Sequence, residues 1–264
     1  MLKIENICKT FNQGTVNKKK ALIDLNLHIK PGDFITVIGG NGAGKSTMLN
    51  AVAGVYSVES GSIFLDGQDI TRQPEHQRAR LLGRVFQDPM MGTAANMGIE
   101  ENLAMAFRRG KRRGLSWGIT KEERESYVEK LKSLDLGLEN RLKSKVGLLS
   151  GGQRQALTLL MATLQKPKVL LLDEHTAALD PKTARKVLEL TQEIVTRDSL
   201  TTLMITHNMK DAIRIGNRLI MMYEGRIIYD VEGEEKKNLK TADLLAKFGT
   251  ASGGEFANDR MMLS

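Results

Sequence analysis

A glycine-rich segment near the N-terminus constrains the possible folds of this chain more than any other feature. Residues 39–46 read Gly-Gly-Asn-Gly-Ala-Gly-Lys-Ser and fit the pattern G-x-x-x-x-G-K-[ST]. The apolar run Phe34 to Ile38 precedes it directly, and a helical stretch to about Ala53 follows it, stopped by Gly54. A strand, a glycine loop and a helix in this order form the context that the pattern requires. We therefore predict an α/β fold built around a P-loop that binds a nucleoside triphosphate.

The residue types of this loop suit phosphate. Glycines let the backbone wrap closely around an anion, so that successive N–H groups point inward, and the helix N-terminus adds its positive end. We expect Lys45 to reach the β- and γ-phosphates and the Ser46 hydroxyl to bind Mg²⁺. The residues expected to bind the nucleotide here are Gly39, Gly40, Asn41, Gly42, Ala43, Gly44, Lys45, Ser46 and Thr47.

Two acidic residues end a later apolar strand. Val169 to Leu172 is followed directly by Asp173 and Glu174. A carboxylate at the end of a buried strand is unfavourable unless it meets a cation, so Asp173 is expected to hold Mg²⁺ directly or through water. Glu174 would then sit nearer the γ-phosphate and polarise the attacking water. Acidic loops after strands are common, and it is the combination with the P-loop that favours hydrolysis.

Two further polar residues follow predicted strands. His207 ends the apolar run at 201–206, where open α/β sheets place their ligand sites, and it is expected to contact the γ-phosphate and orient the water or Glu174. Gln87 follows a short strand at 84–86 and is expected to touch Mg²⁺ or water. Taken alone, a histidine or glutamine at such a place is usually an ordinary surface or core residue.

The order of elements predicts one large domain with a helical insertion. Period-two alternation near the N-terminus indicates strands, and the alternation of strands with helices after residue 150 implies parallel strands with crossover helices. Helical periodicity at 100–109 and 120–134, with Thr120 and Glu123 as a capping box, places an α-helical subdomain at about 88–150. The domain is expected to span 1–248, followed by a flexible tail at 249–264.

Composition bounds the setting of the protein. The formal net charge is +8, partly gathered at residues 18–20 and 108–113, and these clusters fit either solvated loops or proximity to an anionic membrane surface. Neither cluster is interleaved with aromatic residues, so we expect no nucleic-acid partner. The single cysteine, Cys8, suits a reducing cytosol. The longest apolar stretches are too short to cross a bilayer, and the N-terminus lacks an apolar signal core, so export is not expected.

The segment Leu149-Ser150-Gly151-Gly152-Gln153 indicates the family. A serine and two glycines opening a helix make a second helix N-terminus suited to phosphate, and one chain needs only one γ-phosphate site. Together with the P-loop and the acidic pair, this segment resembles the ABC ATPases over about residues 1–235. The resemblance implies a P-loop core with an N-terminal antiparallel β subdomain and the inserted α-helical subdomain.

The resemblance also implies how the site works. Two copies of the chain would pair head-to-tail around two ATP molecules with Mg²⁺, each bound between the P-loop of one copy and the signature segment of the other. Ser150 and Gly152 would contact the partner's γ-phosphate, Asp180 would lie at the dimer seam, and Phe11 would stack on adenine. The nucleotide-binding residues carried over in this way are Phe11, Ser150, Gly151, Gly152, Gln153 and Asp180.

Two positions depart from the family pattern. Gly40 replaces the proline that commonly follows the first loop glycine, a change expected to be harmless to phosphate binding. His175 replaces the proline that usually follows the catalytic glutamate, so a less rigid turn is expected there.

One cassette per chain, and helices too short to form a very long coiled coil, favour a transport ATPase with separate permease subunits, at the cytoplasmic face of a bacterial membrane. The segment 69–80 resembles ATPases of branched-chain amino-acid importers, and residues 92–109 resemble a related bacterial group found with an amino-acid-type permease and a solute-binding protein proposed for aromatic amino acids. An importer is therefore favoured. An ABC exporter, or a soluble ABC ATPase acting on nucleic acid or in cofactor assembly, remains an alternative.

Overall fold

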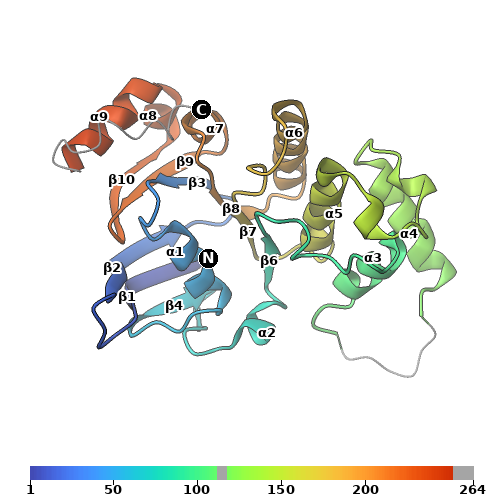
Figure 1. Ribbon diagram of the computed structural model, residues 1–264, viewed down its shortest axis with the longest axis horizontal. Coiled ribbons are helices and arrows are strands. Elements are labelled where there is room, and N and C mark those ends of the chain that lie inside the picture. The colour runs from blue at the N-terminus through green and yellow to red at the C-terminus, as the bar shows by residue number, and fades with distance from the viewer. Residues whose placement is uncertain (112–117, 252–264) are drawn as a thin grey trace. The chain divides into compact units, whose positions relative to one another are not determined.

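The computed structural model describes residues 1–111 and 118–251. Predictions made for Arg112 and Arg113 of the second basic cluster, and for most of the C-terminal tail, lie outside the described residues. The chain divides into two compact units, one formed by Met1–Arg78 with Ser199–Ser264 and the other by Ala79–Asp198 (Figure 1). The two units are described in turn.

The first unit contains an antiparallel sheet with the strand order β2-β1-β4-β5. Its strands are β1 (Leu2–Phe11), β2 (Lys19–Ile29), β4 (Ser60–Leu65) and β5 (Gln68–Asp69). The period-two pattern predicted for β2 is confirmed, because Leu25, Leu27 and Ile29 are buried while the side chains between them are exposed. This sheet matches the antiparallel β subdomain that the resemblance implied.

A second group of strands in this unit has the order β10-β9-β3-β8 and carries the glycine loop. Its strands are β3 (Phe34–Gly39), β8 (Thr201–Ile205), β9 (Arg218–Tyr223) and β10 (Arg226–Glu232). β3 pairs in parallel with both β8 and β9, and every residue of β3 is buried. Burial on both faces explains why β3 reads as a continuous apolar run.

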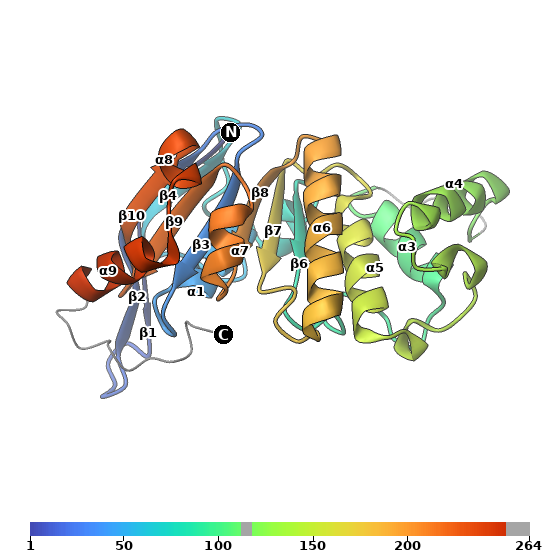
Figure 2. The ribbon, with the colours of Figure 1, turned by 90° about the horizontal axis from the view of Figure 1, so that it is seen from above.

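The helices of the first unit are α1 (Lys45–Ala53), α2 (Glu75–Arg78), α7 (Met209–Arg214), α8 (Gly233–Lys237) and α9 (Thr241–Ala251). Leu244 and Phe248 of α9 join a buried cluster with Met209 and Ala212 of α7 and Ile38 of β3, which fixes α9 in place. Figure 2 shows α7, α8 and α9 grouped beside β9 and β10. Among the described helices, none is both long and apolar enough to cross a membrane.

The second unit has a parallel strand pair and a larger set of helices. The strands are β6 (Leu82–Val85) and β7 (Val169–Asp173), and the helices are α3 (Ile99–Phe107), α4 (Lys121–Lys132), α5 (Gly151–Thr163) and α6 (Pro181–Arg197), with short 3₁₀ turns at Leu138–Asn140 and Val146–Leu148. Helices α5 and α6 lie side by side in Figures 1 and 2.

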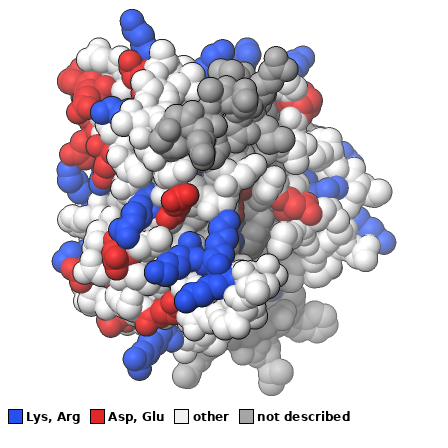
Figure 3. Space-filling model, turned by 60° about the vertical axis from the view of Figure 1, so that its left-hand side comes forward, with Lys and Arg blue, Asp and Glu red and all other residues white. Residues whose placement is uncertain are grey.

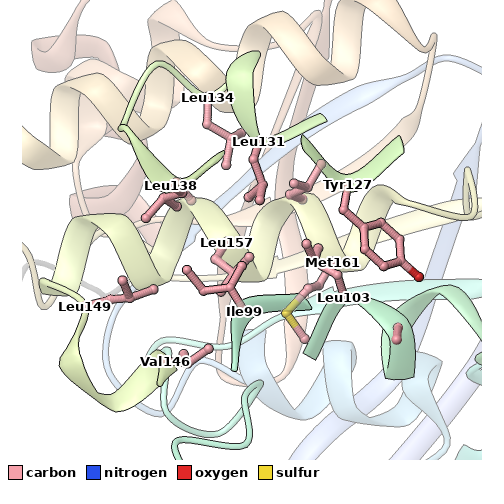
Figure 4. Close-up of a cluster of buried hydrophobic side chains, with 13 residues drawn as sticks. Ile99, Leu103, Tyr127, Leu131, Leu134, Leu138, Val146, Leu149, Leu157 and Met161 are labelled. Carbon is pink, nitrogen blue, oxygen red and sulfur yellow. The ribbon is translucent and has the colours of Figure 1, made fainter. Parts of the chain in front are cut away.

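A hydrophobic cluster holds α3, α4 and α5 together (Figure 4). Leu103 of α3, Leu131 of α4 and Leu157 of α5 are each fully buried, and each such side chain contributes about 1.5–3 kcal/mol. The predicted capping box of α4 is confirmed, since the Glu123 N–H donates to Thr120 Oγ1 at 3.2 Å and the Thr120 N–H donates to Glu123 Oε2 at 3.0 Å. The predicted helical periodicity thus corresponds to a packed subdomain.

The excess of basic residues is interspersed with acidic ones on the face shown in Figure 3. The first unit also contains ion pairs between basic and acidic side chains. Lys30 Nζ lies 2.9 Å from Glu232 Oε1, and Arg218 donates to both carboxylate oxygens of Asp230. An exposed pair such as Lys30–Glu232 contributes about 0–1 kcal/mol and lowers the local positive field.

Candidate functional site

The predicted phosphate loop leaves the buried strand β3 and leads directly into α1. Gly39 has φ 151° and Gly44 has φ 101°. A Cβ at Gly39 would lie 2.2 Å from the carbonyl oxygen of Met222, and one at Gly44 would lie 2.5 Å from that of Ala21. Both positions therefore require glycine, because the loop packs directly against the backbones of β9 and β2.

Two lysine ammonium groups lie at this loop. Lys45 is 5% exposed, and its Nζ donates to the carbonyl oxygens of Gly39 at 2.7 Å and Gly40 at 3.1 Å. Lys19 Nζ lies 2.7 Å from the position that a Cβ of Gly42 would occupy. The sequence analysis placed Lys19 in a solvated or membrane-facing cluster, and no local signal relates it to the loop. Two cations beside a set of backbone N–H groups form a surface suited to a polyanion.

His207 leaves the same edge of the strand group as the loop. Val37 of β3 pairs in parallel with Ile205 of β8, so Gly39 and His207 each lie two residues farther along neighbouring strands. The Thr206 N–H donates to the Val37 carbonyl at 3.1 Å and fixes the start of this connection. The exposed side chain of His207 is therefore placed beside the phosphate loop, and its contact with a γ-phosphate stays a prediction.

Phe11, the residue predicted to stack on adenine, is the last residue of β1 and pairs with Lys19 at the start of β2. Its ring meets Tyr56 edge-on, with centroids 5.2 Å apart and an interplanar angle of 79°. Lys9 Nζ lies 5.5 Å from its centroid. The ring is partly exposed, so it is accessible to a planar base, and the stacking itself stays a prediction.

In the second unit, the acidic pair and Gln87 also share one edge. Val85 of β6 pairs in parallel with Leu172 of β7, so Gln87 and Glu174 each lie two residues beyond this pair. Asp173 is the last residue of β7 and is half-buried, whereas Gln87 is exposed. The structure thus brings these three predicted residues to one end of a strand pair, and their relation to Mg²⁺ stays a prediction.

The residue after Glu174 has a buried side chain. His175 is 1% exposed, and its Nε2 lies 3.0 Å from Thr191 Oγ1 in α6. Burial lowers the pKa of His175 to about 4, so the imidazole is neutral at pH 7. A neutral, enclosed ring of this kind is unsuited to proton transfer with solvent.

The signature segment begins α5. Ser150 caps this helix, because its Oγ accepts the Gln153 N–H at 3.3 Å while its own N–H donates to Gln153 Oε1 at 3.2 Å. Gln153 also donates through Nε2 to the Leu136 carbonyl at 3.3 Å. Ser150 and Gly151 are exposed, so an anion can approach the N–H groups at this end of the helix.

The N-termini of α5 and α6 are in contact. A Cβ at Gly152 would lie 2.1 Å from Thr183 Cγ2 in α6, so close packing of the helices requires glycine here. Asp180 caps α6 by accepting the Thr183 N–H at 3.1 Å, and hydrogen bonds from Thr183 lower the pKa of Asp180. The predicted signature residues and Asp180 therefore lie at neighbouring helix starts.

Two arginines that support the site escaped the sequence analysis. Arg154 donates to the carbonyls of Val146, Gly147 and Leu149 at 3.3, 3.1 and 3.0 Å, and it thereby holds the loop before the signature segment. Arg78 is 2% exposed and donates to four main-chain carbonyls, two of them in α1. Main-chain acceptors give no sequence signal, so only the fold reveals these roles.

Known proteins are similar to this chain in sequence and in fold. The ABC transporter family pattern matches residues 22–177. The tyrosine transport ATP-binding protein of Clostridioides difficile is 44% identical over 248 residues, which cover 94% of this chain and 98% of that protein. The thiamine import ATP-binding protein of Yersinia pseudotuberculosis is 35% identical over 205 residues, which cover 78% of this chain and 82% of that protein.

Solved structures agree with the sequence relatives. A dimeric ATP-binding cassette in a post-hydrolysis state, bound to ADP and Pi, has a TM-score of 0.74 and 30% identity and covers 88% of this chain and 98% of its own. An ADP-bound cassette of an ABC transporter has a TM-score of 0.76 and 28% identity, with coverage of 94% and 98%. The predicted ABC ATPase fold is confirmed. The chain belongs to the ABC transporter family, as an ATP-binding subunit that hydrolyses ATP to energise solute import.

Proposed function

We propose that two copies of this chain pair head-to-tail, with each ATP held between the P-loop of one copy and the signature segment of the other. The observation that carries the proposal is the presence of two helix N-termini suited to phosphate in one chain, those of α1 and α5. A single triphosphate has one γ-phosphate, so the second helix start serves a nucleotide bound by another copy. The similarity to a dimeric cassette supports this arrangement.

Mg²⁺ is the metal that the donor set fits. The residues that the sequence predicts as its ligands, Ser46 in the first unit and Gln87 and Asp173 in the second, carry hydroxyl, amide and carboxylate oxygens, which Mg²⁺ prefers. In the described parts of the chain, no three His, Cys, Asp or Glu residues cluster as a metal site. Mg²⁺ is usually bound by only a few protein ligands, because it keeps several water molecules and also binds the phosphates of the substrate. When bound, it would neutralise charge on the β- and γ-phosphates.

Glu174 is proposed as the general base, with His207 and Gln87 orienting the water. Glu174→Gln preserves the shape of the side chain and removes its basicity, so ATP binding should persist while kcat falls by about 10²–10⁴. Slow turnover should also trap the dimer, which native mass spectrometry with ATP can detect. Glu189→Gln, an exposed residue of α6, is the matched control. Turnover of Glu174→Gln at the wild-type rate would remove Glu174 from this role.

The transported solute is proposed to be an amino acid of the aromatic kind, delivered by a binding protein to separate permease subunits. The protein would act at the cytoplasmic face of the membrane of a bacterial cell. The 44% identity to a tyrosine transport ATP-binding protein, along nearly the whole of both chains, supports this choice. Cells that lack the gene should lose uptake of radiolabelled tyrosine, and wild-type protein should restore uptake where Glu174→Gln does not. Unchanged tyrosine uptake in the deletion strain would contradict the proposed solute.

A further inference from the structure

The turn that carries Glu174 is held in a backbone conformation that a glutamate rarely adopts. Glu174 has φ 47°, in the left-handed region, where a residue with a side chain is less stable by about 1–2 kcal/mol. The Glu174 carbonyl accepts the Ala177 N–H at 2.9 Å, which closes the turn on one side. That hydrogen bond contributes about 1 kcal/mol, and other contacts around the turn add to it as restraints on the backbone.

The side chain of His175 provides a restraint of this kind. Its ring is 1% exposed, and Nε2 lies 3.0 Å from Thr191 Oγ1, itself on a fully buried residue of α6. The Thr191 hydroxyl donates its one proton to the Val187 carbonyl at 2.8 Å. With this proton directed at Val187, Thr191 Oγ1 accepts from the ring, and we assign His175 the Nε2–H tautomer, which donates to Thr191.

This hydrogen bond joins the residue next to Glu174 to the interior of a long helix. Helix α6 runs from Pro181 to Arg197, so Thr191 lies well inside it, in a part that does not fray. The start of α6 is fixed by the Asp180 cap. The segment from Glu174 to Asp180 is thus attached to α6 at both of its ends. Glu174 cannot leave the left-handed region without drawing the imidazole out of its buried place.

We propose that His175 is a positioning residue for Glu174: its hydrogen bond to Thr191 holds the turn so that the Glu174 carboxylate stays at the end of β7. The proposal rests on the assignment of Glu174 as the general base. The family pattern has proline at this position, which restricts the backbone by its own ring. Here the restraint comes instead from a buried side chain that is anchored to α6.

Two variants remove the hydrogen bond from opposite ends. Thr191→Val keeps the size of the side chain and removes the acceptor, whereas His175→Leu removes the donor. Each should lower kcat for ATP hydrolysis about tenfold or more, because a catalytic group displaced by about 1 Å loses up to 10²-fold in rate. KM for MgATP should change by less than about twofold, since neither residue is among those predicted to bind the nucleotide. The double variant should be no slower than the slower single one.

Rescue distinguishes positioning from general loss of structure. His175→Gln places an amide N–H where Nε2–H was, so its kcat should return to within about threefold of wild type. Thr196→Val changes an exposed threonine of the same helix and should leave kcat unchanged. If His175→Leu does not fold, Thr191→Val, which lacks only one hydroxyl, carries the test alone.

The outcomes separate this inference from the proposed function. Wild-type kcat in Thr191→Val, or a His175→Gln variant as slow as His175→Leu, would overturn the positioning role. A Glu174→Gln variant that turns over normally in the same assay would instead refute the general-base assignment. A fall in kcat for Thr191→Val and His175→Leu, with recovery in His175→Gln, supports both.

Discussion

Replacement of Arg78 by methionine tests whether a single buried cation secures the helix of the P-loop. Arg78 Nη1 donates to the carbonyls of Ala51 and Val52, in the last turn of α1, at 2.8 Å each. Nε donates to Gln73 and Nη2 to Thr71, also at 2.8 Å. The carbonyl groups in the last turn of a helix lack partners within the helix, and Arg78 provides donors for two of them. It also places a positive charge at the negative end of the helix dipole.

The expected loss follows from these contacts. Hydrogen bonds to charged groups contribute about 1.5–3 kcal/mol each, but the four share one guanidinium whose burial costs several kcal/mol. Methionine keeps most of the aliphatic contact and leaves the carbonyls without their donor. We therefore expect Arg78→Met to lower the free energy of unfolding by about 3–5 kcal/mol. For a chain of this size, that corresponds to a fall in Tm of roughly 10 °C.

Equilibrium unfolding in urea, followed by circular dichroism, measures this loss directly. Arg72→Met is the matched control, because Arg72 is exposed and should change the free energy of unfolding by less than about 0.5 kcal/mol. The ATP affinity of Arg78→Met should also fall, since Lys45 and Ser46 begin the helix whose end is loosened. If the free energy of unfolding of Arg78→Met were within about 1 kcal/mol of the wild-type value, the hydrogen bonds of Arg78 to α1 would not stabilise the protein as proposed.

Three other sites give separate expectations. Lys19→Gln should weaken ATP binding about twofold to fivefold and should weaken AMP binding by a smaller factor, as measured by titration calorimetry. An equal effect of Lys20→Gln would contradict a specific contact of Lys19 at the loop. Gly152→Ala should lower the free energy of unfolding by about 1–3 kcal/mol, and Thr183→Ser should restore it by removing the Cγ2 atom; failure of this rescue in denaturant melts would exclude the predicted clash. The neutral form of His175 is favoured in the fold, where burial lowers its pKa to about 4, so the unfolded chain binds more protons as pH falls from about 6.5 to 4. The free energy of unfolding should therefore fall by about 3 kcal/mol as the pH drops from about 6.5 to 4. If a His175→Gln variant lost the same amount of stability in acid as the wild type, protonation of His175 would not be the cause.

The strand, loop and helix at residues 34–53 could be predicted from the sequence, because a buried parallel strand and a glycine loop each appear as a pattern of consecutive residues. The places of His207 and Gln87 followed from a general rule, that parallel strands bring their carboxyl ends to one edge. Both expectations agree with the strand register. The long amphipathic helix α6 starts with an Asp180 cap and a proline, and both are helix-start signals that can be read from consecutive residues.

Features that depend on distant partners were not predictable. Lys19 reads as one of three consecutive lysines, and only the packing of β2 on the loop brings its ammonium group to Gly42. Helices α8 and α9 were not predicted, because five- and eleven-residue helices gain most of their stability from tertiary packing. The buried place of His175 depends on a hydroxyl sixteen residues away, which no local pattern specifies.

The capping box at Ser150 also affects how much conformational entropy this serine would lose on binding a phosphate. Its Oγ uses a lone pair to accept the Gln153 N–H, and the hydroxyl proton is still able to donate. The side chain has already lost most of its rotamer freedom in starting its own helix. Little further conformational entropy is lost when it donates to an anion, so the bond that begins α5 also preorganises the serine for its proposed contact with a nucleotide bound by another subunit.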